Sequence, residues 1–393
     1  MVTEAFALQM SFVAIGWQVY SISGNALDLG LLGLAEFLPL LLLALPAGQL
    51  ADRVPRRHLL AFMMLANLVV LVGLLGVTVA DTGRVWPFFV LAFLQGVGSA
   101  IGAPAGRALT PSLVPEEILV SALAQRSIAF QLSAVTAPAV GGLLLAVRAE
   151  LVYMVAIVLA VIALGCVLAL RRGREPAAEG AAGLDEVLAG IRLIRRTNVL
   201  LGAISLDLFA VLLGGAVALL PIFAKDILDA GPTGLGLLRA SPAVGALVAA
   251  AIIARHPISR RAGPLLFGVV AGFGLSMVVF GLSRSLWLSM LALAVGSGLD
   301  MVSVVLRQTI LPLVTPDELR GRVNAVEMVF ISASNELGAF ESGVAAALIG
   351  AVPAVVVGGA ATVVVAVVWW RLFPALARVD RLDELRPVSA VPS

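Results

Sequence analysis

The sequence predicts an all-α membrane protein with about twelve spanning helices. Of its 393 residues, 61% are apolar and 13% are charged, whereas a soluble domain contains about 45–50% apolar and about 25% charged residues. Long apolar runs follow one another along the chain, separated by short charged segments. These runs are too long and continuous for the strands of a membrane barrel. Since only helices and closed barrels satisfy the backbone inside lipid, helices are expected.

The apolar runs give approximate limits for each span. We expect helices over residues 5–22, 29–50, 58–80, 86–107, 118–146, 150–170, 198–220, 233–254, 264–283, 286–308, 320–350 and 353–373. Met1 lies almost inside the first run and has no basic leader before it, so no cleavable signal peptide is visible. Residues 1–4 stay outside the first predicted span.

Basic residues are distributed unequally between the two sets of loops. One set carries arginine clusters within residues 53–57, 171–174, 192–196, 255–261 and 320–322. The other set carries only Arg84, Arg148, Lys225 and Arg284. Cytoplasmic loops carry an excess of Lys and Arg, so the first set is expected to be cytoplasmic. An even number of spans then places both termini in the cytoplasm.

One long connection divides the chain into an N-terminal half (1–170), a linker (171–197), a C-terminal half (198–373) and a tail (374–393). Within the linker, one helical face gathers Leu184, Val187, Leu188, Ile191 and Ile194. This pattern predicts an amphipathic helix. Its arginines either face anionic lipid at the inner leaflet or lie in solvent along a linker helix.

The two halves share a spaced pattern, which predicts a parallel repeat of one six-helix unit. Six positions of the first half recur in the second at the same spacing around a cytoplasmic loop: Pro111, Pro115, Glu117, Ala124, Ser133 and Gly142 correspond to Pro312, Pro316, Glu318, Ala325, Ser334 and Gly343.

A charged segment between the second and third spans carries the most specific motif. Residues 48–57 read Gly-Gln-Leu-Ala-Asp-Arg-Val-Pro-Arg-Arg and describe a tight charged turn at a membrane surface. They match Gly-x-Leu-Ala-Asp-Arg-x-x-Arg-Arg, so the chain resembles the major facilitator superfamily of transporters along nearly its whole length. That resemblance implies two pseudo-symmetric six-helix halves with a substrate site between them near the midplane.

The resemblance also implies a gate below the second span. Asp52 would engage the cytoplasmic start of the span 320–350 while the cytoplasmic side is closed, so the contact would set the balance of two states. The residues of this gate motif are Gly48, Asp52, Arg53, Arg56, Arg57, Arg320 and Arg322. The alternative is a positive-inside loop with one incidental acid.

The span 118–146 contains a second motif around Pro138, Gly141 and Gly142. It resembles the exporter motif Gly-Pro-x-x-Gly-Gly with Ala137 in place of the first glycine, and the resemblance implies a drug–proton antiporter. The alternative is a proline kink with small residues that let a neighbouring helix approach.

Ionisable residues inside the spans are costly in lipid and indicate functional sites. The span 320–350 alone contains Glu327, Glu336 and Glu341, and its stretch 320–343 resembles the enterobactin-exporter-like branch, close to the macrolide-efflux branch. Candidates for proton coupling or for the cavity are Asp207, Asp300, Glu327, Glu336, Glu341, Arg126, Arg307 and Asn335. Alternatively, the acids pair with Arg126 or Arg307 as structural ties.

These features predict a secondary transporter rather than an enzyme. It would export a small amphipathic molecule, siderophore-like or macrolide-like by resemblance alone, in exchange for protons by alternating access. The related family motif places an arginine where this chain has Ala92, which leaves a nutrient importer or facilitator open. A non-transporting membrane sensor or scaffold is the third alternative.

Several partners are excluded by composition. With one cysteine and two histidines, the chain has few of the ligands that zinc sites usually use, so we expect no metal site. The sequence contains no phosphate loop of the form Gly-x-x-x-x-Gly-Lys-Ser/Thr. We therefore expect no cofactor and no nucleic acid. The expected partners are a small-molecule substrate, protons and membrane lipids, and the expected functional form is a monomer.

Overall fold

The computed structural model describes residues 2–113, 115–169, 184–258 and 260–386. For residues 44–45, 48–49, 51–53, 104, 107–113, 116, 120, 184–189, 325, 332 and 384 it describes the backbone only. The chain forms two compact units. Unit 1 comprises Met1–Ala181 and Ala218–Ala240, and unit 2 comprises Ala182–Val217 and Ser241–Ser393.

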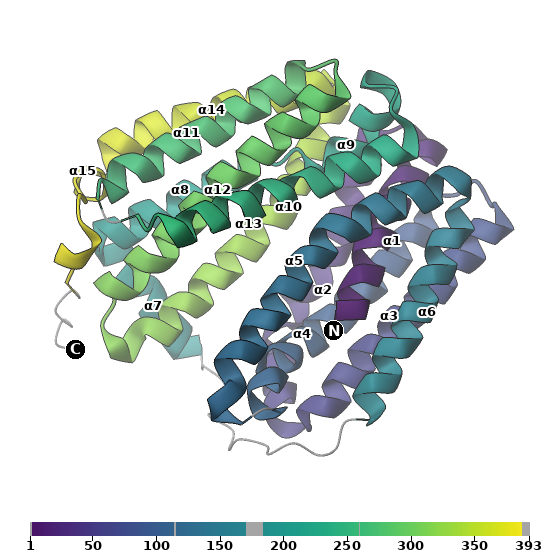
Figure 1. Ribbon diagram of the computed structural model, residues 1–393, viewed down its shortest axis with the longest axis horizontal. Helices are drawn as coiled ribbons and strands as arrows, with labels where there is room; N and C mark the ends of the chain where they lie inside the picture. The colour runs from purple at the N-terminus through teal and green to yellow at the C-terminus, as the bar shows by residue number, and fades with distance from the viewer. Residues whose placement is uncertain (1, 114, 170–183, 259, 387–393) are drawn as a thin grey trace. The chain divides into compact units, whose positions relative to one another are not determined.

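Unit 1 contains six long helices, which run from purple to blue-teal in Figure 1. They are α1 (Val2–Ser23), α2 (Ala26–Arg53), α3 (Arg56–Ala80), α4 (Trp86–Leu113), α5 (Glu116–Val147) and α6 (Ala149–Ala169). Helix α1 packs on α5 and α6, α2 packs on α4, and α3 packs on both α4 and α6. The unit also contains α9 (Leu220–Ile222), η2 (Phe223–Ile227) and the start of α10 (Gly231–Arg255).

Unit 2 contains the later helices of the chain. They are α7 (Leu184–Arg196), α8 (Asn198–Gly214), the rest of α10, α11 (Ala262–Leu282), α12 (Leu286–Val314), α13 (Arg320–Ile349), α14 (Ala351–Leu372) and α15 (Pro374–Ala377). Single turns of this unit are η3 (Asp317–Leu319) and η4 (Leu382–Glu384), while η1 (Val217–Leu219) begins at the last residue of the segment Ala182–Val217 and continues in unit 1. Helix α11 packs on α12 and α14, and α8 packs on α13 and α14.

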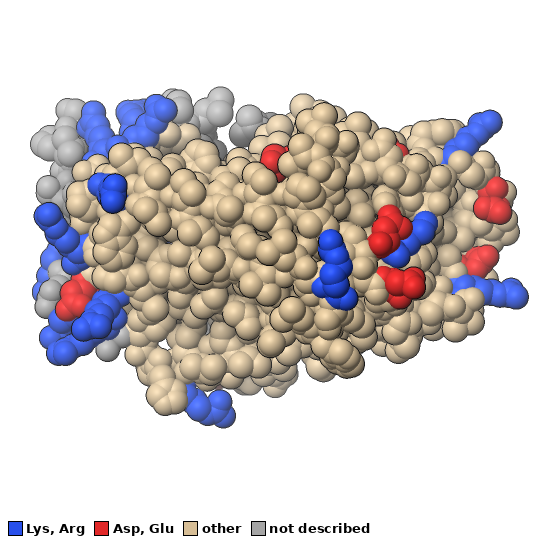
Figure 2. All heavy atoms as spheres, turned by 90° about the horizontal axis from the view of Figure 1, so that it is seen from above, with Lys and Arg blue, Asp and Glu red and all other residues tan. Residues whose placement is uncertain are grey.

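The predicted fold class is confirmed. Among the described residues, 11 helices are long and apolar enough to cross a membrane, and the 30-residue α13 adds the long helix that carries three acids. On the face in Figure 2, uncharged side chains predominate. Large exposed apolar residues such as Leu42, Ile128 and Trp287 suit contact with lipid rather than with water. The chain is a multi-pass membrane protein.

The observed helices differ from the approximate predicted limits by several residues in places, and two of these differences affect the interpretation. The first helix begins at Val2 and not at residue 5, so Glu4 is part of it. The predicted charged turn at 48–57 is much shorter, because α2 continues to Arg53 and only Val54 and Pro55 separate it from α3. The end of an apolar run indicates where the contact with lipid ends. A helix continues as long as its backbone hydrogen bonds continue, and α2 ends shortly before Pro55.

The predicted helix at 198–220 is interrupted. Helix α8 ends at Gly214, and Gly215 has an extended backbone. A short 3-10 turn, a helical turn and the π-helical η2 follow. The hydroxyl of Ser342 on α13 donates a 2.6 Å hydrogen bond to the carbonyl oxygen of Gly215, so a side chain satisfies a carbonyl that the break leaves without its helical partner.

The predicted amphipathic helix of the linker exists as α7, and the two residues of its apolar face whose side chains are described, Ile191 and Ile194, pack on protein. Ile194 is buried in the core of unit 2 together with Leu200 and Val326. A Cβ added at Gly190 would lie 3.0 Å from the carbonyl oxygen of Arg322, so α7 lies against α13. Arg192, Arg195 and Arg196 remain on the exposed side.

Candidate functional site

Three helices of unit 2 bring an ion-pair cluster together in the interior. Nη2 of Arg307 on α12 lies 2.7 Å from Oδ1 of Asp207 on α8. Nη1 of the same guanidinium lies 3.6 Å from Oε1 of Glu327 on α13. The side chain of Arg307 is 3% exposed, and those of Asp207 and Glu327 are 8% and 11% exposed. We call these three residues, with Asp300, the Arg307 cluster.

Apolar packing fixes the positions of these side chains. Arg307 follows Leu306 and precedes Ile310 and Leu311, which are buried in the core of unit 2. Asp207 follows the buried Leu206 on α8, and α8 packs on both α12 and α13. The apolar neighbours therefore hold the charged groups where water cannot replace their partners.

Asp300 extends the cluster along α12. It lies seven residues before Arg307, about two helical turns, and so on the same face of the helix. The charges of both Asp207 and Arg307 act on it. Asp300 thus adds a third carboxyl group on the helix of the guanidinium that Asp207 and Glu327 contact. If all three were ionised, two negative charges would remain uncompensated in the interior, at a high cost in free energy.

The two contacts of Arg307 differ in kind. The 2.7 Å contact with Asp207 has the length of a charge-assisted hydrogen bond, whereas 3.6 Å to Glu327 is too long for a hydrogen bond. In the described part of the chain, Nε of Arg307 has no hydrogen-bond partner. The guanidinium therefore has one N–H donor without a partner, and Glu327 lies close to it without a hydrogen bond. A small movement of the Arg307 side chain could break its contact with Asp207 and form a hydrogen bond to Glu327.

Other predicted coupling residues lie outside this cluster. On α13, Glu341 is exposed and Glu336 is half-buried. Asn335 is exposed and donates to the carbonyl oxygen of Ile331 on its own helix at 3.0 Å. Arg126 is a half-buried residue of α5 in unit 1. Of the two arginines considered as structural partners, Arg307 is the one that forms the ion pair with Glu327.

The gate motif is only partly described. For Gly48, Asp52 and Arg53 the structure describes the backbone only, so the gate stays a prediction. Arg57 donates to the carbonyl oxygen of Leu168 on α6 at 2.5 Å. Arg320 contacts Asp317 at 2.7 Å and the carbonyl oxygen of Pro312 at 3.0 Å. The remaining motif residues, Arg56 and Arg322, are half-buried.

The exporter-motif helix α5 makes very close contacts through its glycines. A Cβ at Gly142 would lie 2.7 Å from the carbonyl oxygen of Pro232 and 2.8 Å from Cα of Gly236 on α10. A Cβ at Gly236 would in turn lie 2.5 Å from the carbonyl oxygen of Pro138. Gly141 meets the backbone of Met10 on α1 in the same way. Only glycine permits these backbone approaches.

A buried polar chain in unit 1 was missed by the sequence-based assignment. The amide nitrogen of Asn67 on α3 donates to Oε1 of Glu4 on α1 at 2.9 Å, and that of Gln95 on α4 donates to Oδ1 of Asn67 at 2.9 Å. All three residues are at most 6% exposed. The signal was present as an acid next to an apolar run, but residues 1–4 had been placed outside the first span.

Comparison with known proteins identifies the family. The family described as transmembrane secretion effector matches residues 2–388. Relatives include proteins named enterobactin exporter EntS from Shigella dysenteriae and from Escherichia coli O81. Each is 28% identical over 344 residues, which cover 86% of this chain and 78% of the relative.

Solved structures share the fold at low sequence identity. The nucleoside transporter NupG aligns with a TM-score of 0.73 at 13% identity and covers 95% of this chain and 96% of its own. A bacterial homologue of the iron transporter ferroportin aligns with a TM-score of 0.71 at 15% identity and covers 96% of each chain. The chain therefore belongs to the transmembrane secretion effector family, within the major facilitator superfamily of membrane transporters.

Proposed function

We propose that this protein exports a small amphipathic, siderophore-like molecule across the inner membrane in exchange for protons. The named relatives support the direction of transport and the class of substrate, because they are called enterobactin exporters. The observation that carries the coupling is the Arg307 cluster, in which the carboxyl groups of Asp207 and Glu327 contact one guanidinium inside a membrane domain. Such intramembrane acids are typical of proton relays in transporters.

The chemistry of the cluster suggests how a proton changes the conformational equilibrium. When Asp207 is ionised, it holds Arg307 through a charge-assisted hydrogen bond. A proton that binds to Asp207 removes the charge, so Arg307 is free to move toward Glu327. Because the carboxylates lie on different helices, exchanging the partner alters the contacts between α8 and α13. A proton thus favours one of two states according to its difference in affinity for them.

The loops and the family support the proposed orientation and partners. The excess of arginines on one set of loops favours cytoplasmic termini. The protein would act as a monomer that binds its substrate, protons and surrounding lipids. The Asp52 motif would stabilise the state closed to the cytoplasm, as its resemblance to the superfamily motif implies.

Purified protein in proteoliposomes with an imposed proton gradient tests this function. Enterobactin is the probe, since relatives are named for it, and a macrolide is the second compound. With an acidic interior, outward proton flow should drive accumulation of the probe above its external concentration. A protonophore should abolish that accumulation.

Two results would contradict parts of the proposal. If the flux is unchanged without a proton gradient, proton exchange is contradicted and the protein acts by facilitated diffusion. Absence of flux for both compounds, in vesicles where the protein is folded and inserted, would contradict the proposed substrate class.

A further inference from the structure

The buried chain formed by Glu4, Asn67 and Gln95 lies deep in the membrane part of unit 1. Asn67 lies near the middle of the 25-residue α3, and the carboxyl group of Glu4 accepts its hydrogen bond. Glu4 is therefore far from either end of α3, although it belongs to the first turn of α1. An ionisable residue at that depth is costly and needs a partner or a proton.

The described partner of Glu4 is a neutral amide. Asn67 offers one N–H donor, and its own carbonyl oxygen already accepts from Gln95. A single amide hydrogen bond does not offset the desolvation of an ionised carboxylate, which costs several kcal/mol. A neutral, protonated carboxyl group suits this environment better, because it has no charge to solvate.

The charged groups on the surrounding helices lie mainly near helix ends. Helices α2, α5 and α6 pack on α1, and α3 and α4 carry the amides. The described ionisable residues on these elements are Asp28 and Glu36 on α2, Arg56, Arg57 and His58 on α3, Glu117 and Arg126 on α5, and Glu150 on α6.

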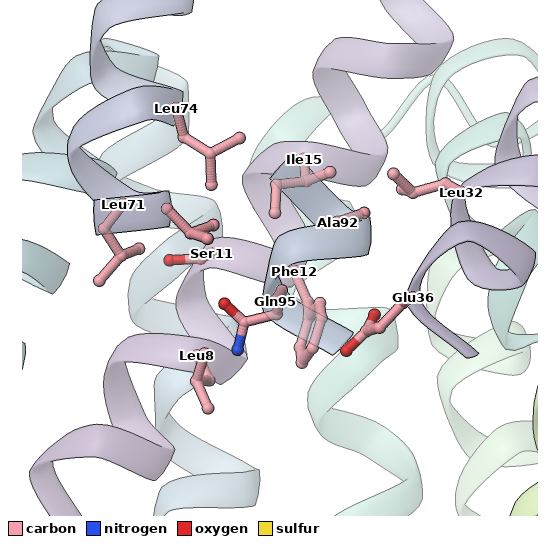
Figure 3. A pocket seen from close by; sticks show the side chains of 11 residues that line it. Leu8, Ser11, Phe12, Ile15, Leu32, Glu36, Leu71, Leu74, Ala92 and Gln95 are labelled. Atoms are coloured by element: carbon pink, nitrogen blue, oxygen red, sulfur yellow. The ribbon is translucent and has the colours of Figure 1, made fainter. Parts of the chain in front are cut away.

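A pocket within unit 1 reaches the far end of the polar chain. It is lined by Ser11, Phe12, Glu36, Ala92 and Gln95 together with apolar side chains of α1, α2 and α3. Figure 3 shows the polar groups of Ser11, Glu36 and Gln95 among these apolar residues. Gln95 thus has one side in the pocket and one hydrogen bond to Asn67, so the pocket can bring water close to the chain that ends at Glu4.

We propose that Glu4 is a proton-binding site of unit 1, separate from the Arg307 cluster, and that water reaches it through the pocket beside Gln95. A hydronium ion that passes from the pocket to Glu4 transfers its proton there: one of its O–H bonds breaks, an O–H bond forms on a carboxyl oxygen of Glu4, and a water molecule remains. This site adds to the proposed proton-coupled export a second place where a proton is held.

Infrared difference spectroscopy on the purified full chain tests the site without any transported substrate. A protonated carboxyl group gives its own C=O stretching band, which disappears when the pH is raised and shifts in heavy water. The wild-type difference spectrum should contain a band that Glu4→Gln lacks. The glutamine can still accept from Asn67, so the fold should survive. The matched control is Glu150→Gln in the first turn of α6, which should keep the band.

Two further variants make the assignment specific. Asn67→Leu should keep the band but shift its frequency, because the carboxyl group loses its amide donor. Ala92→Leu should fill the pocket and slow the exchange of the band in heavy water several-fold. The site is overturned if Glu4→Gln and the wild type give the same spectrum, and the access route is overturned if Ala92→Leu exchanges as fast as the wild type.

The infrared test and the transport test fail independently. If the protein shows the Glu4 band but transports neither probe, the proton site is supported and the proposed export is contradicted. If the protein accumulates the probe but shows no Glu4 band, the proposed export is supported and the Glu4 site is contradicted. The coupled proton is then assigned to the Arg307 cluster.

Discussion

Arg307 binds Asp207 through a 2.7 Å contact between Nη2 and Oδ1, and both side chains are almost fully buried. The pair joins α12 to α8 beside the apolar core of unit 2. A buried ion pair is weak support for stability by itself, but removing one partner leaves a buried charge without compensation. This difference makes the contribution of the pair measurable.

The first prediction is a double-mutant cycle on that pair. Arg307→Gln alone should lower the free energy of unfolding by about 3–5 kcal/mol, because it leaves buried carboxylates without a counter-charge. Asp207→Asn alone should cost less, because Glu327 still lies 3.6 Å from the guanidinium. The double variant should be more stable than the sum of the two effects by about 0.5–3 kcal/mol. Chemical unfolding in detergent measures all four proteins. Strictly additive effects would mean that the two residues do not interact.

The second prediction separates proton coupling from substrate movement. Glu327 lies 3.6 Å from Arg307, so Glu327→Gln breaks no short hydrogen bond and should leave the fold intact. If Glu327 receives Arg307 when Asp207 is protonated, the variant should lose gradient-driven accumulation at least tenfold while it still exchanges substrate at equal concentrations. Equal loss of both activities would indicate a general defect in folding or substrate binding.

A control acid for that experiment lies in the tail. Two hydrogen bonds from Arg381 hold the pKa of Asp383 below its usual range. This carboxyl group is therefore ionised at neutral pH, and its interaction with Arg381 is lost only as the pH falls into the acid range. Asp383→Asn should change neither activity in the proteoliposomes.

The sequence predicted the helices well because their signal is local. An apolar run of about 20 residues is sufficient for a span, and the amphipathic face of α7 is readable from its period. The helix ends were less predictable, since lipid thickness and backbone hydrogen bonding end at different residues. The break at Gly215 and the π-helical turn after it depend on contacts with α13 that no local pattern contains.

The candidate site was predictable as a set of residues but not as an arrangement. Asp207, Asp300, Arg307 and Glu327 were all singled out because charges inside spans are rare. Which acid contacts Arg307 depends on how three helices rotate and pack. The periodicity of the sequence shows which residues share a helix face, but it does not show which helix packs against that face. Glu4 was missed for a different reason, since the first span was drawn to begin just after it.

The third prediction concerns the backbone contact between α5 and α10. Gly142→Ala places a methyl group 2.7 Å from the carbonyl oxygen of Pro232, so the two helices must separate. The variant should be less stable by about 1–3 kcal/mol, as expected for overpacking. Gly165→Ala on α6 is the matched control, because a Cβ there meets nothing within 4 Å. It should be neutral or stabilising by about 0.5–1 kcal/mol. Equal stability of the two variants would contradict the close approach.

The fourth prediction concerns the contact between the end of α1 and the π-helical η2. The Tyr20 hydroxyl donates to the Asp226 carboxylate, and Nζ of Lys225 lies 5.6 Å from the centre of the Tyr20 ring. Tyr20→Phe keeps the ring for Lys225 and removes only the hydroxyl. It should cost about 1–2 kcal/mol, the lower part of the range of a hydrogen bond to a charged group, because Asp226 is exposed to solvent. Tyr20→Leu should cost more, because it also removes the cation–π contact.

The acid side of this contact has its own matched control. Asp226→Asn weakens the acceptor and should destabilise the protein less than Tyr20→Phe, because the amide oxygen still accepts the hydroxyl. Asp229→Asn, three residues later, should have no effect. Asp229 is exposed with φ of 47°, a left-handed conformation that asparagine adopts readily. Thermal unfolding in detergent compares the four variants. Equal destabilisation by Asp229→Asn and Tyr20→Phe would contradict the prediction. The loss of stability would then come from any change in this turn, and the hydroxyl of Tyr20 would have no specific role in holding η2 against α1.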